Sequence, residues 1–139
     1  MIVRVLHRLL AGRVWRHPFV TARATRPEGC QLHVLPALGA ASVEHVLKVP
    51  RGACPVSGNP RSGRLRVQYR PGAVVLEIVS LEVLLQRAAR EHPPLARSIE
   101  ELARLLHAET RLALGVAVQV ELDLIVEPGP QRYRVSFDG

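Results

Sequence analysis

The clearest pattern in the sequence is an alternation of apolar and other residues that runs from Val116 to Val126. Successive side chains of a strand point to opposite faces of a sheet. The apolar members of the run are Val116, Val118, Val120, Leu122, Leu124 and Val126. The positions between them include Gln119, Glu121 and Asp123. This pattern predicts a strand with one buried face and one face in water.

A second, shorter alternating run follows a Pro-Gly-Pro break, and the two runs together predict an antiparallel hairpin. Their apolar faces coincide when Leu124 opposes Val135, because a one-residue slip would set Val135 against Asp123. The same register sets Glu127 opposite Arg132, which is a favourable cross-strand pair. We therefore expect the connecting loop to hold an even number of residues.

An earlier hairpin is predicted between Val43–Val49 and Arg64–Arg70. In the second of these strands the apolar residues point one way, while Arg64 and Arg66 point the other way. The connection from Pro50 to Gly63 is long for a hairpin. Loops of that length inside compact domains are usually functional, so this segment is the first place to look for a site.

Two amphipathic helices are predicted between the hairpins. Ser80 is a candidate cap of the first helix, and Pro93-Pro94 ends it. The second helix begins with the capping box Ser98-Ile99-Glu100-Glu101, and Gly115 closes it. The residues expected to be buried are Leu81, Leu84, Leu85, Ala88 and Ala89 in the first helix, and Ile99, Leu102, Leu105 and Leu106 in the second.

The order of these elements predicts an α+β domain, strand–strand–helix–helix–strand–strand (ββααββ), in which an antiparallel four-stranded sheet carries two helices on one face. A chain of 139 residues fits one domain, which we place at 1–139, with a poorly defined N-terminal extension at 1–40. The second face of the sheet is polar enough to face water. The free sheet edges must be covered, charged or paired, and edge-to-edge pairing between subunits would make a homo-oligomer.

The net charge of +7 favours an anionic partner such as RNA, a nucleotide cofactor or an acidic subunit. Of the basic residues only Lys48 is a lysine, and guanidinium groups bind phosphate and carboxylate through two parallel hydrogen bonds. Solvated arginines of an arginine-rich proteome would give the same composition, so charge by itself identifies no ligand.

The two cysteines, Cys30 and Cys54, are too few for a disulfide framework and indicate a reducing, cytoplasmic setting. No apolar run approaches the roughly 18 residues needed to span a bilayer, so no membrane partner is expected. The first 27 residues contain arginines and no acidic residue, as in a transit peptide. An equally simple interpretation makes them the first strand or helix of the domain.

The segment Cys54-Pro55-Val56-Ser57-Gly58-Asn59-Pro60 resembles a loop of the NADPH-dependent 7-cyano-7-deazaguanine reductases, the nitrile reductases of queuosine synthesis. That family has Cys-Pro-x-[Ser/Thr]-Gly-x-Pro-Asp before a strand that ends in Tyr-x-Pro, and this chain has Tyr69-Arg70-Pro71. The family continues with Glu-Ser-Lys-Ser-Leu-Lys, where this chain has Glu77-Ile78-Val79-Ser80-Leu81-Glu82. The resemblance covers about residues 43–110. It implies the tunnelling fold, in which subunits join sheet edges into a barrel with ligand pockets at their interfaces.

The resemblance also implies roles for individual residues. In the family the cysteine attacks the nitrile carbon to give a covalent thioimide, which makes Cys54 the candidate nucleophile. The family's aspartate proton donor is replaced by Arg61, which could lower the pKa of Cys54 and stabilise an anionic nitrogen. Glu91, with His92 beside it, is the candidate carboxylate for the two N–H donors of a deazaguanine ring.

The cofactor segment departs from the family. Glu77 is a further candidate for substrate binding and Ser80 for cofactor binding, although a strand-end residue and a helix cap would look the same in the sequence. The family's two lysines, suited to the phosphate of NADPH, are replaced by Val79 and Glu82. The carboxylate of Glu82 would repel a phosphate group that the lysine of the family attracts.

Three functions remain open at this point. The first is nitrile reduction of 7-cyano-7-deazaguanine through Cys54, in a queuosine-type modification of transfer RNA. The second is that of archaeal relatives that add ammonia to the nitrile and make an amidine on transfer RNA without NADPH. The third is a non-catalytic protein that binds a purine-like or pterin-like ligand. Cys30, His33, His45 and Cys54 could supply the four ligands of a zinc ion. Their spacing, however, fits no common zinc module.

Overall fold

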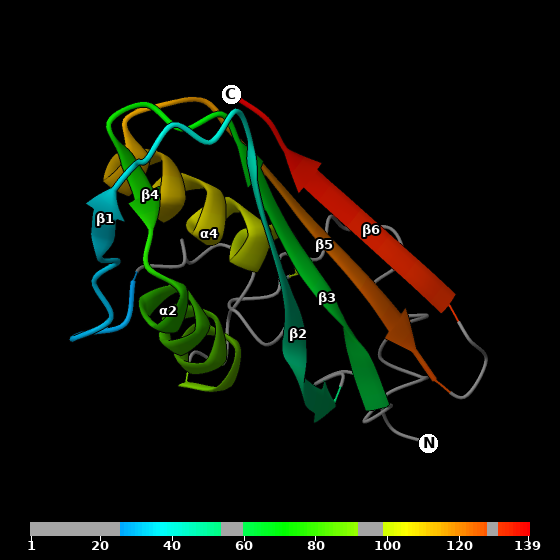
Figure 1. Cartoon of the computed structure of the whole chain (residues 1–139). Coiled ribbons are helices and arrows are strands. Elements are labelled where there is room, and N and C mark those ends of the chain that lie inside the picture. The colour runs from blue at the N-terminus through cyan, green and yellow to red at the C-terminus, as the bar shows by residue number, and fades with distance from the viewer. Residues whose placement is uncertain (1–25, 54–59, 92–98, 128–130) are drawn as a thin grey trace, which may run out of the picture.

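The computed structural model describes residues 26–53, 60–91, 99–127 and 131–139. Four antiparallel strands form one sheet in the order β2-β3-β5-β6, and both helices lie on the same side of it (Figure 1). The elements of this layer pair are β2 (Val43–Ala53), β3 (Pro60–Tyr69), α2 (Ile78–Glu91), α4 (Ile99–Leu114), β5 (Val118–Val126) and β6 (Gln131–Phe137). The predicted α+β class and the predicted order of strands and helices are confirmed.

The core lies between the helices and the inner face of the sheet. The predicted helix faces are confirmed, except that Ala89 and Ile99 are only partly buried. Fully buried side chains of the two layers are Leu65, Val67, Leu81, Leu84, Leu85, Leu106, Val120 and Leu122. Each such side chain contributes about 1.5–3 kcal/mol to stability by leaving water. Aliphatic side chains can therefore stabilise this core although it has few aromatic residues. Neither α2 nor α4 is long and apolar enough to cross a bilayer, and the described residues contain no other helix.

The first hairpin extends further than its sequence pattern. β2 and β3 pair as far as Gly52 with Arg61 and Ala53 with Pro60, with an irregularity between Val49 and Gly52. The predicted long connection from Pro50 to Gly63 is therefore wrong, because only residues 54–59 separate the strands. Backbone pairing continues here although proline and glycine interrupt the alternation of side chains, and side-chain alternation was the only signal available.

The register of the second hairpin is displaced by two residues from the predicted one. Leu124 opposes Tyr133 and Leu122 opposes Val135, so the predicted Leu124–Val135 pairing is wrong. A two-residue displacement keeps every side chain on its predicted face, because the period of a strand is two. The hydrophobic pattern therefore predicts which side chains face the core. It does not distinguish between two registers that differ by two residues.

Charged contacts account for the register that is observed. Glu127 donates its amide to the carbonyl of Pro60 at 3.0 Å and so extends the contact with β3, and it does not oppose Arg132. Arg132 instead binds Asp123, with Nε–Oδ1 at 2.9 Å and Nη2–Oδ2 at 2.5 Å. Arg134 Nη2 donates to the same carboxylate at 3.2 Å. The bidentate pair with Asp123 replaces the predicted pair with Glu127.

Acid is expected to weaken this hairpin over a defined pH range. The hydrogen bond from Arg132, and then that from Arg134, lowers the pKa of Asp123 from 3.8 to about 2. A carboxyl whose pKa is depressed by folding stabilises the protein above its unfolded pKa, and that contribution is lost as the pH falls through the folded pKa. Urea unfolding should therefore show a free energy of unfolding that falls between pH 3.8 and about pH 2. Asp123→Asn should flatten this part of the profile, and parallel profiles for the two proteins would contradict the assignment.

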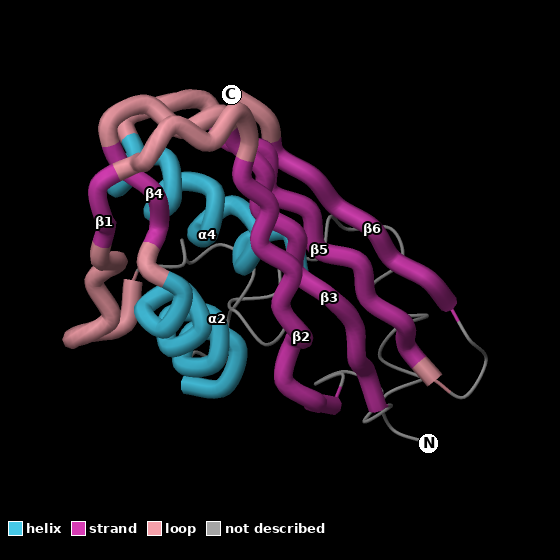
Figure 2. Tube along the Cα trace, in the orientation of Figure 1, coloured by secondary structure: helices cyan, strands magenta, loops and turns pink. Residues whose placement is uncertain are grey.

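A second, two-stranded sheet was not predicted. β1 (Val34–Pro36) pairs antiparallel with β4 (Val74–Leu76) beside the start of α2 (Figure 2). Tyr69 connects it to the main sheet, because the amide of Leu76 donates to the Tyr69 hydroxyl at 2.9 Å. The same hydroxyl lies 3.1 Å from His45 Nε2. Tyr69 is 5 % exposed, so this junction is dry.

Removing the Tyr69 hydroxyl is expected to loosen the junction. Tyr69→Phe leaves the Leu76 amide without its acceptor, and a buried donor left unsatisfied costs about 1–3 kcal/mol. Denaturant unfolding should show a loss in that range. His45→Phe removes the other neighbour of the hydroxyl without orphaning a backbone donor, and we expect a smaller loss for it. Equal losses in the two variants would contradict this account of the junction.

Candidate functional site

The segments that carry the predicted chemistry leave and re-enter the fold at one end of the sheet. A small cavity of ≈ 30 Å³ at this end is lined by residues from the end of β2, the start of β3, the end of α2 and the start of α4. Its polar lining is Arg51, Gly52, Arg61 and Arg90. Residues 54–59 connect β2 to β3 and residues 92–98 connect α2 to α4, so both connections are anchored around this cavity. Cys54 and His92 lie outside the described residues, as does the side chain of Glu91.

Three arginines, Arg51, Arg61 and Arg90, line this cavity. Arg61 is half-buried on β3, opposite Gly52 on one side and Val126 on the other. A Cβ atom at Gly52 would lie 3.4 Å from Arg61 Nε, which places the guanidinium group directly beside this part of β2. Arg90 lies in the last turn of α2. Cations close to a thiol favour the thiolate, and they also stabilise an anion that develops on a bound substrate.

Glu77 is placed at the start of α2, where it caps the helix. Its carboxylate accepts the amides of Val79 at 2.8 Å and Ser80 at 2.7 Å, the geometry of a residue that immediately precedes a helix. These backbone hydrogen bonds lower the pKa of Glu77, first through Val79 and then through Ser80. The prediction that Ser80 caps α2 is therefore wrong, because the helix already begins at Ile78.

Ser80 lies inside the first turn of α2 and is buried. Its hydroxyl donates to the carbonyl of Glu77 at 3.0 Å and accepts the amide of His33 at 3.0 Å. Helices rise about 1.5 Å per residue, so the start and the end of α2 are about 20 Å apart. A single chain thus does not bring Glu77 and Ser80 to the arginine-lined end, and their roles in substrate and cofactor binding remain predictions.

The positions where the reductases carry lysines face solvent. Val79 is 62 % exposed, and Glu82 is exposed on α2 beside a groove of ≈ 520 Å³ between α2 and β2. The first two turns of α2 contain no basic residue. The first two turns of α2 therefore offer a carboxylate and apolar side chains to this groove. Its cations, Lys48, Arg51 and Arg90, come from β2 and from the end of α2.

The described residues that were considered as zinc ligands make other contacts. Cys30 is 2 % exposed and belongs to the hydrophobic core. His45 is stacked on Tyr69 at a ring separation of 5.8 Å, and burial lowers its pKa. Within residues 26–53, 60–91, 99–127 and 131–139, no three acidic, histidine or cysteine side chains gather as a metal site.

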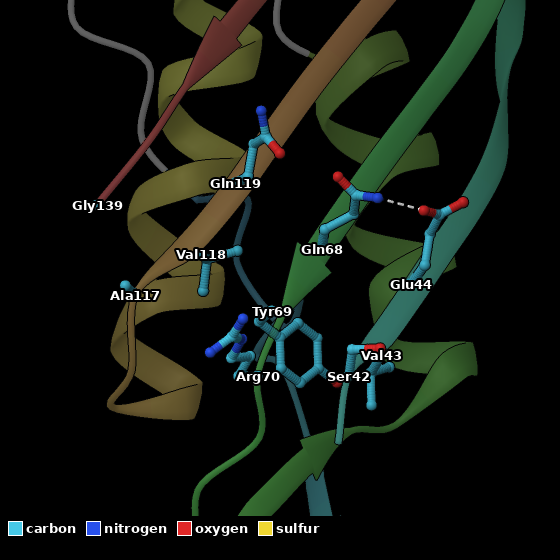
Figure 3. Close-up of a pocket in the computed structure, with 10 residues that line it drawn as sticks. All are labelled: Ser42, Val43, Glu44, Gln68, Tyr69, Arg70, Ala117, Val118, Gln119 and Gly139. Atoms are coloured by element: carbon cyan, nitrogen blue, oxygen red, sulfur yellow. Dashed lines mark hydrogen bonds between the residues drawn. The ribbon is translucent and has the colours of Figure 1, made fainter. Parts of the chain in front are cut away.

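A second hollow lies at the opposite end of the sheet and was not predicted. It measures ≈ 380 Å³ and is lined by Glu44 of β2, Gln68 of β3 and Gln119 of β5, with Arg70 in the lower part of the view (Figure 3). Gln68 Nε2 donates to the Glu44 carboxylate. Strands rise about 3.4 Å per residue, so the ten residues of β3 separate this hollow from the Arg61 end by about 30 Å. The sequence indicates this hollow only through polar residues at alternate positions of three strands. A sheet face exposed to solvent has the same pattern.

The fold defined by these elements is the tunnelling fold that the sequence resemblance implied, an antiparallel four-stranded sheet with two helices on one face. It is similar to the crystal structure of the archaeosine synthase QueF-like in its apo form, with a TM-score of 0.54. The two chains share 20 % sequence identity, and the match covers 73 % of this chain and 97 % of that one. No protein-family model matches the chain. No curated protein matches its sequence.

Proposed function

We propose that this protein is an enzyme that converts the nitrile of a 7-cyano-7-deazapurine through a covalent thioimide on Cys54. The observation that carries the proposal is that one cavity is lined by residues flanking two connections. The ends of β2 and β3 flank the segment that contains Cys54, and the ends of α2 and α4 flank the segment that contains His92. Three arginines lie at the same end. The fold is similar to that of an archaeosine synthase, and this supports a role in a related modification of transfer RNA.

The first step forms a carbon–sulfur bond and an N–H bond and breaks one π bond of the nitrile. The Cys54 thiolate attacks the nitrile carbon, the nitrile nitrogen takes up a proton, and the product is a thioimide. Negative charge develops on the nitrogen as the carbon–sulfur bond forms, and the half-buried guanidinium of Arg61 would stabilise it electrostatically. An arginine does not release its proton near neutrality, so the proton comes from water or from His92. The Glu91 carboxylate would accept the two ring N–H donors and fix the orientation of the ring.

Ammonia is the second reactant that the residues of this chain favour. The first two turns of α2 carry no cation, and Glu82 presents a carboxylate where the reductases carry a lysine. These residues do not fit the phosphate of NADPH, so we route no step through that cofactor. Attack of ammonia on the thioimide carbon, with departure of the Cys54 thiolate, gives an amidine without oxidation or reduction. The substrate nitrile then belongs to a modified base, either free or already within transfer RNA.

We further propose that the active form is a homo-oligomer joined through sheet edges. β2 and β6 are the edges of the four-stranded sheet. Apolar side chains are exposed along the β2 edge and the neighbouring surface of α2, namely Val46, Ile78, Val79 and Val83. Pairing of β2 with an edge of a second copy would cover these side chains and satisfy its unpaired backbone groups. Light scattering is expected to give a mass of several chains, and Val46→Lys should lower it.

The identity of the second reactant can be tested directly. The protein is incubated with 7-cyano-7-deazaguanine, free or placed in a transfer RNA transcript, together with ¹⁵N-ammonium or with NADPH. We expect ¹⁵N to enter the product as an amidine and the absorbance of NADPH to stay constant. Consumption of NADPH would contradict the ammonia route and restore nitrile reduction. Absence of any product from either form of the nitrile would contradict the proposed function.

A further inference from the structure

The face of the main sheet that lies away from the helices carries a charged hollow, distinct from the Cys54 end. It measures ≈ 180 Å³, and besides Val46 its lining is entirely charged: Arg64, Arg66, Glu121, Asp123, Arg132 and Arg134. Four guanidinium groups thus face two carboxylates. Lys48 lies directly opposite Arg64 in the β2–β3 register, so it adds a further cation at the rim.

The two carboxylates of the hollow are already occupied by the arginines of β6. Asp123 binds Arg132 through both oxygens, at 2.9 and 2.5 Å, and Arg134 at 3.2 Å. Glu121 lies 3.8 Å from Arg134 Nε. Arg64 also faces Asp123 across the β3–β5 ladder, but it makes no ion pair with that carboxylate. The β6 arginines therefore neutralise the acidic side of the hollow.

The cations that β2 and β3 place at this hollow, Lys48, Arg64 and Arg66, lack a bidentate partner of this kind within the described part of the chain. Lys48 and Arg64 form no ion pair with any residue of the described ranges. Arg66 approaches Glu44 only to 3.8 Å, and the Glu44 carboxylate also accepts Gln68. Like charges directly opposite each other on neighbouring strands destabilise a sheet. A bound anion would remove that cost at the Lys48–Arg64 pair.

We propose that this hollow binds a phosphate group, held by Arg64 and Arg66 with Lys48 at its rim. Paired N–H donors of a guanidinium match two phosphate oxygens, and two such groups lie about 7 Å apart along β3 because strands rise about 3.4 Å per residue. The phosphate belongs either to a small molecule, such as a pyrophosphate or a nucleotide, or to an RNA backbone. This site is independent of the proposed function, because Cys54 and Arg61 take no part in it.

Calorimetric titration of the full chain with inorganic pyrophosphate, at constant ionic strength, tests the proposal. The Arg64→Gln variant is expected to bind about tenfold more weakly, the low end for loss of a charge-assisted hydrogen bond at an exposed position. Arg111→Gln removes the same charge from an exposed position on α4 and should change the affinity less than about twofold. Asp123→Asn removes a competing carboxylate and releases Arg132 and Arg134, so binding should strengthen several-fold.

Two outcomes overturn the proposal. One is equal weakening in Arg64→Gln and Arg111→Gln, which would mean attraction by net charge alone. The other is unchanged or weaker binding in Asp123→Asn while circular dichroism shows native secondary structure. A transfer RNA transcript in the same four proteins identifies the source of the phosphate. Binding that follows the pyrophosphate order assigns the hollow to an RNA backbone, and binding that ignores Arg64 and Asp123 assigns it to a small phosphate.

Discussion

Replacing Gly63 with valine is expected to prevent formation of the native sheet or to destabilise it by about 3–5 kcal/mol, the range of severe core substitutions. Gly63 lies in the middle of the sheet, between Val49 on β2 and Leu124 on β5. A Cβ atom there would lie 2.0 Å from the Asp123 carbonyl oxygen and 2.8 Å from the Leu124 Cα. Both are backbone atoms, so β3 and β5 would have to separate.

Gly72→Ala is the matched control for this substitution. A Cβ atom at Gly72 would meet only a methyl group of Val116, at 3.2 Å, and that side chain can adjust. We expect the control to stay within about 1 kcal/mol of the parent protein. Soluble expression, circular dichroism and denaturant unfolding of both variants make the comparison. A Gly63→Val protein as stable as the Gly72→Ala protein would show that β3 and β5 are not packed as described.

Replacing Cys54 with alanine is expected to abolish turnover of the nitrile, by about a thousandfold or more, because the sulfur is the atom that forms the covalent intermediate. The effect should be large because the described residues that line the arginine-lined cavity include no nucleophile that could replace the sulfur. Product formation should be followed by mass spectrometry under saturating ammonium. Retained turnover in Cys54→Ala would place the chemistry elsewhere in the chain.

Cys30→Ala provides the control with the other cysteine of the chain. Cys30 is buried in the hydrophobic core, so its replacement removes a small apolar group and is expected to cost about 1–2 kcal/mol of stability. Turnover per folded molecule should not change. If the two cysteine variants are equally stable and both lose turnover, the assay reports folding and does not report nucleophilic catalysis.

The strands and helices that were predicted from the sequence are long enough for their buried positions to recur with a clear period. The alternation that ends at Val126 and the helical spacing from Leu81 to Ala88 each place several side chains in the core, and the structure confirms both. β1 and β4 have three residues each, which is too short for any period to appear. Their position depends on one buried hydrogen bond, from Leu76 to Tyr69, which no local pattern encodes.

Register and capping were predicted less well because several arrangements satisfy the same pattern. A shift of two residues leaves the apolar faces of β5 and β6 unchanged, and the ion pair of Asp123 with Arg132 accompanies the observed register. At the start of α2, both Glu77 and Ser80 have oxygen atoms that can accept backbone amides. The backbone geometry at Ile78 decides for Glu77, and sequence contains no direct record of that geometry.

The candidate site rests partly on the sequence and partly on the fold. Sequence motif identified the connection between β2 and β3 and the end of α2, and the fold places the anchors of both at one cavity. Arg51 and Arg90 were missed, although Arg90 follows a helical repeat that ends at that cavity. Glu77 and Ser80 were grouped with the site because they follow the motif in sequence, but α2 carries its two ends about 20 Å apart.

A covalent bond between the sulfur of Cys54 and the nitrile carbon would be visible by intact-protein mass spectrometry. After incubation with 7-cyano-7-deazaguanine and without ammonia or NADPH, the mass of the chain should increase by the mass of one nitrile molecule. The increase should persist in Cys30→Ala and be absent in Cys54→Ala. An unchanged mass of the parent protein, or an adduct that survives in Cys54→Ala, would contradict the account.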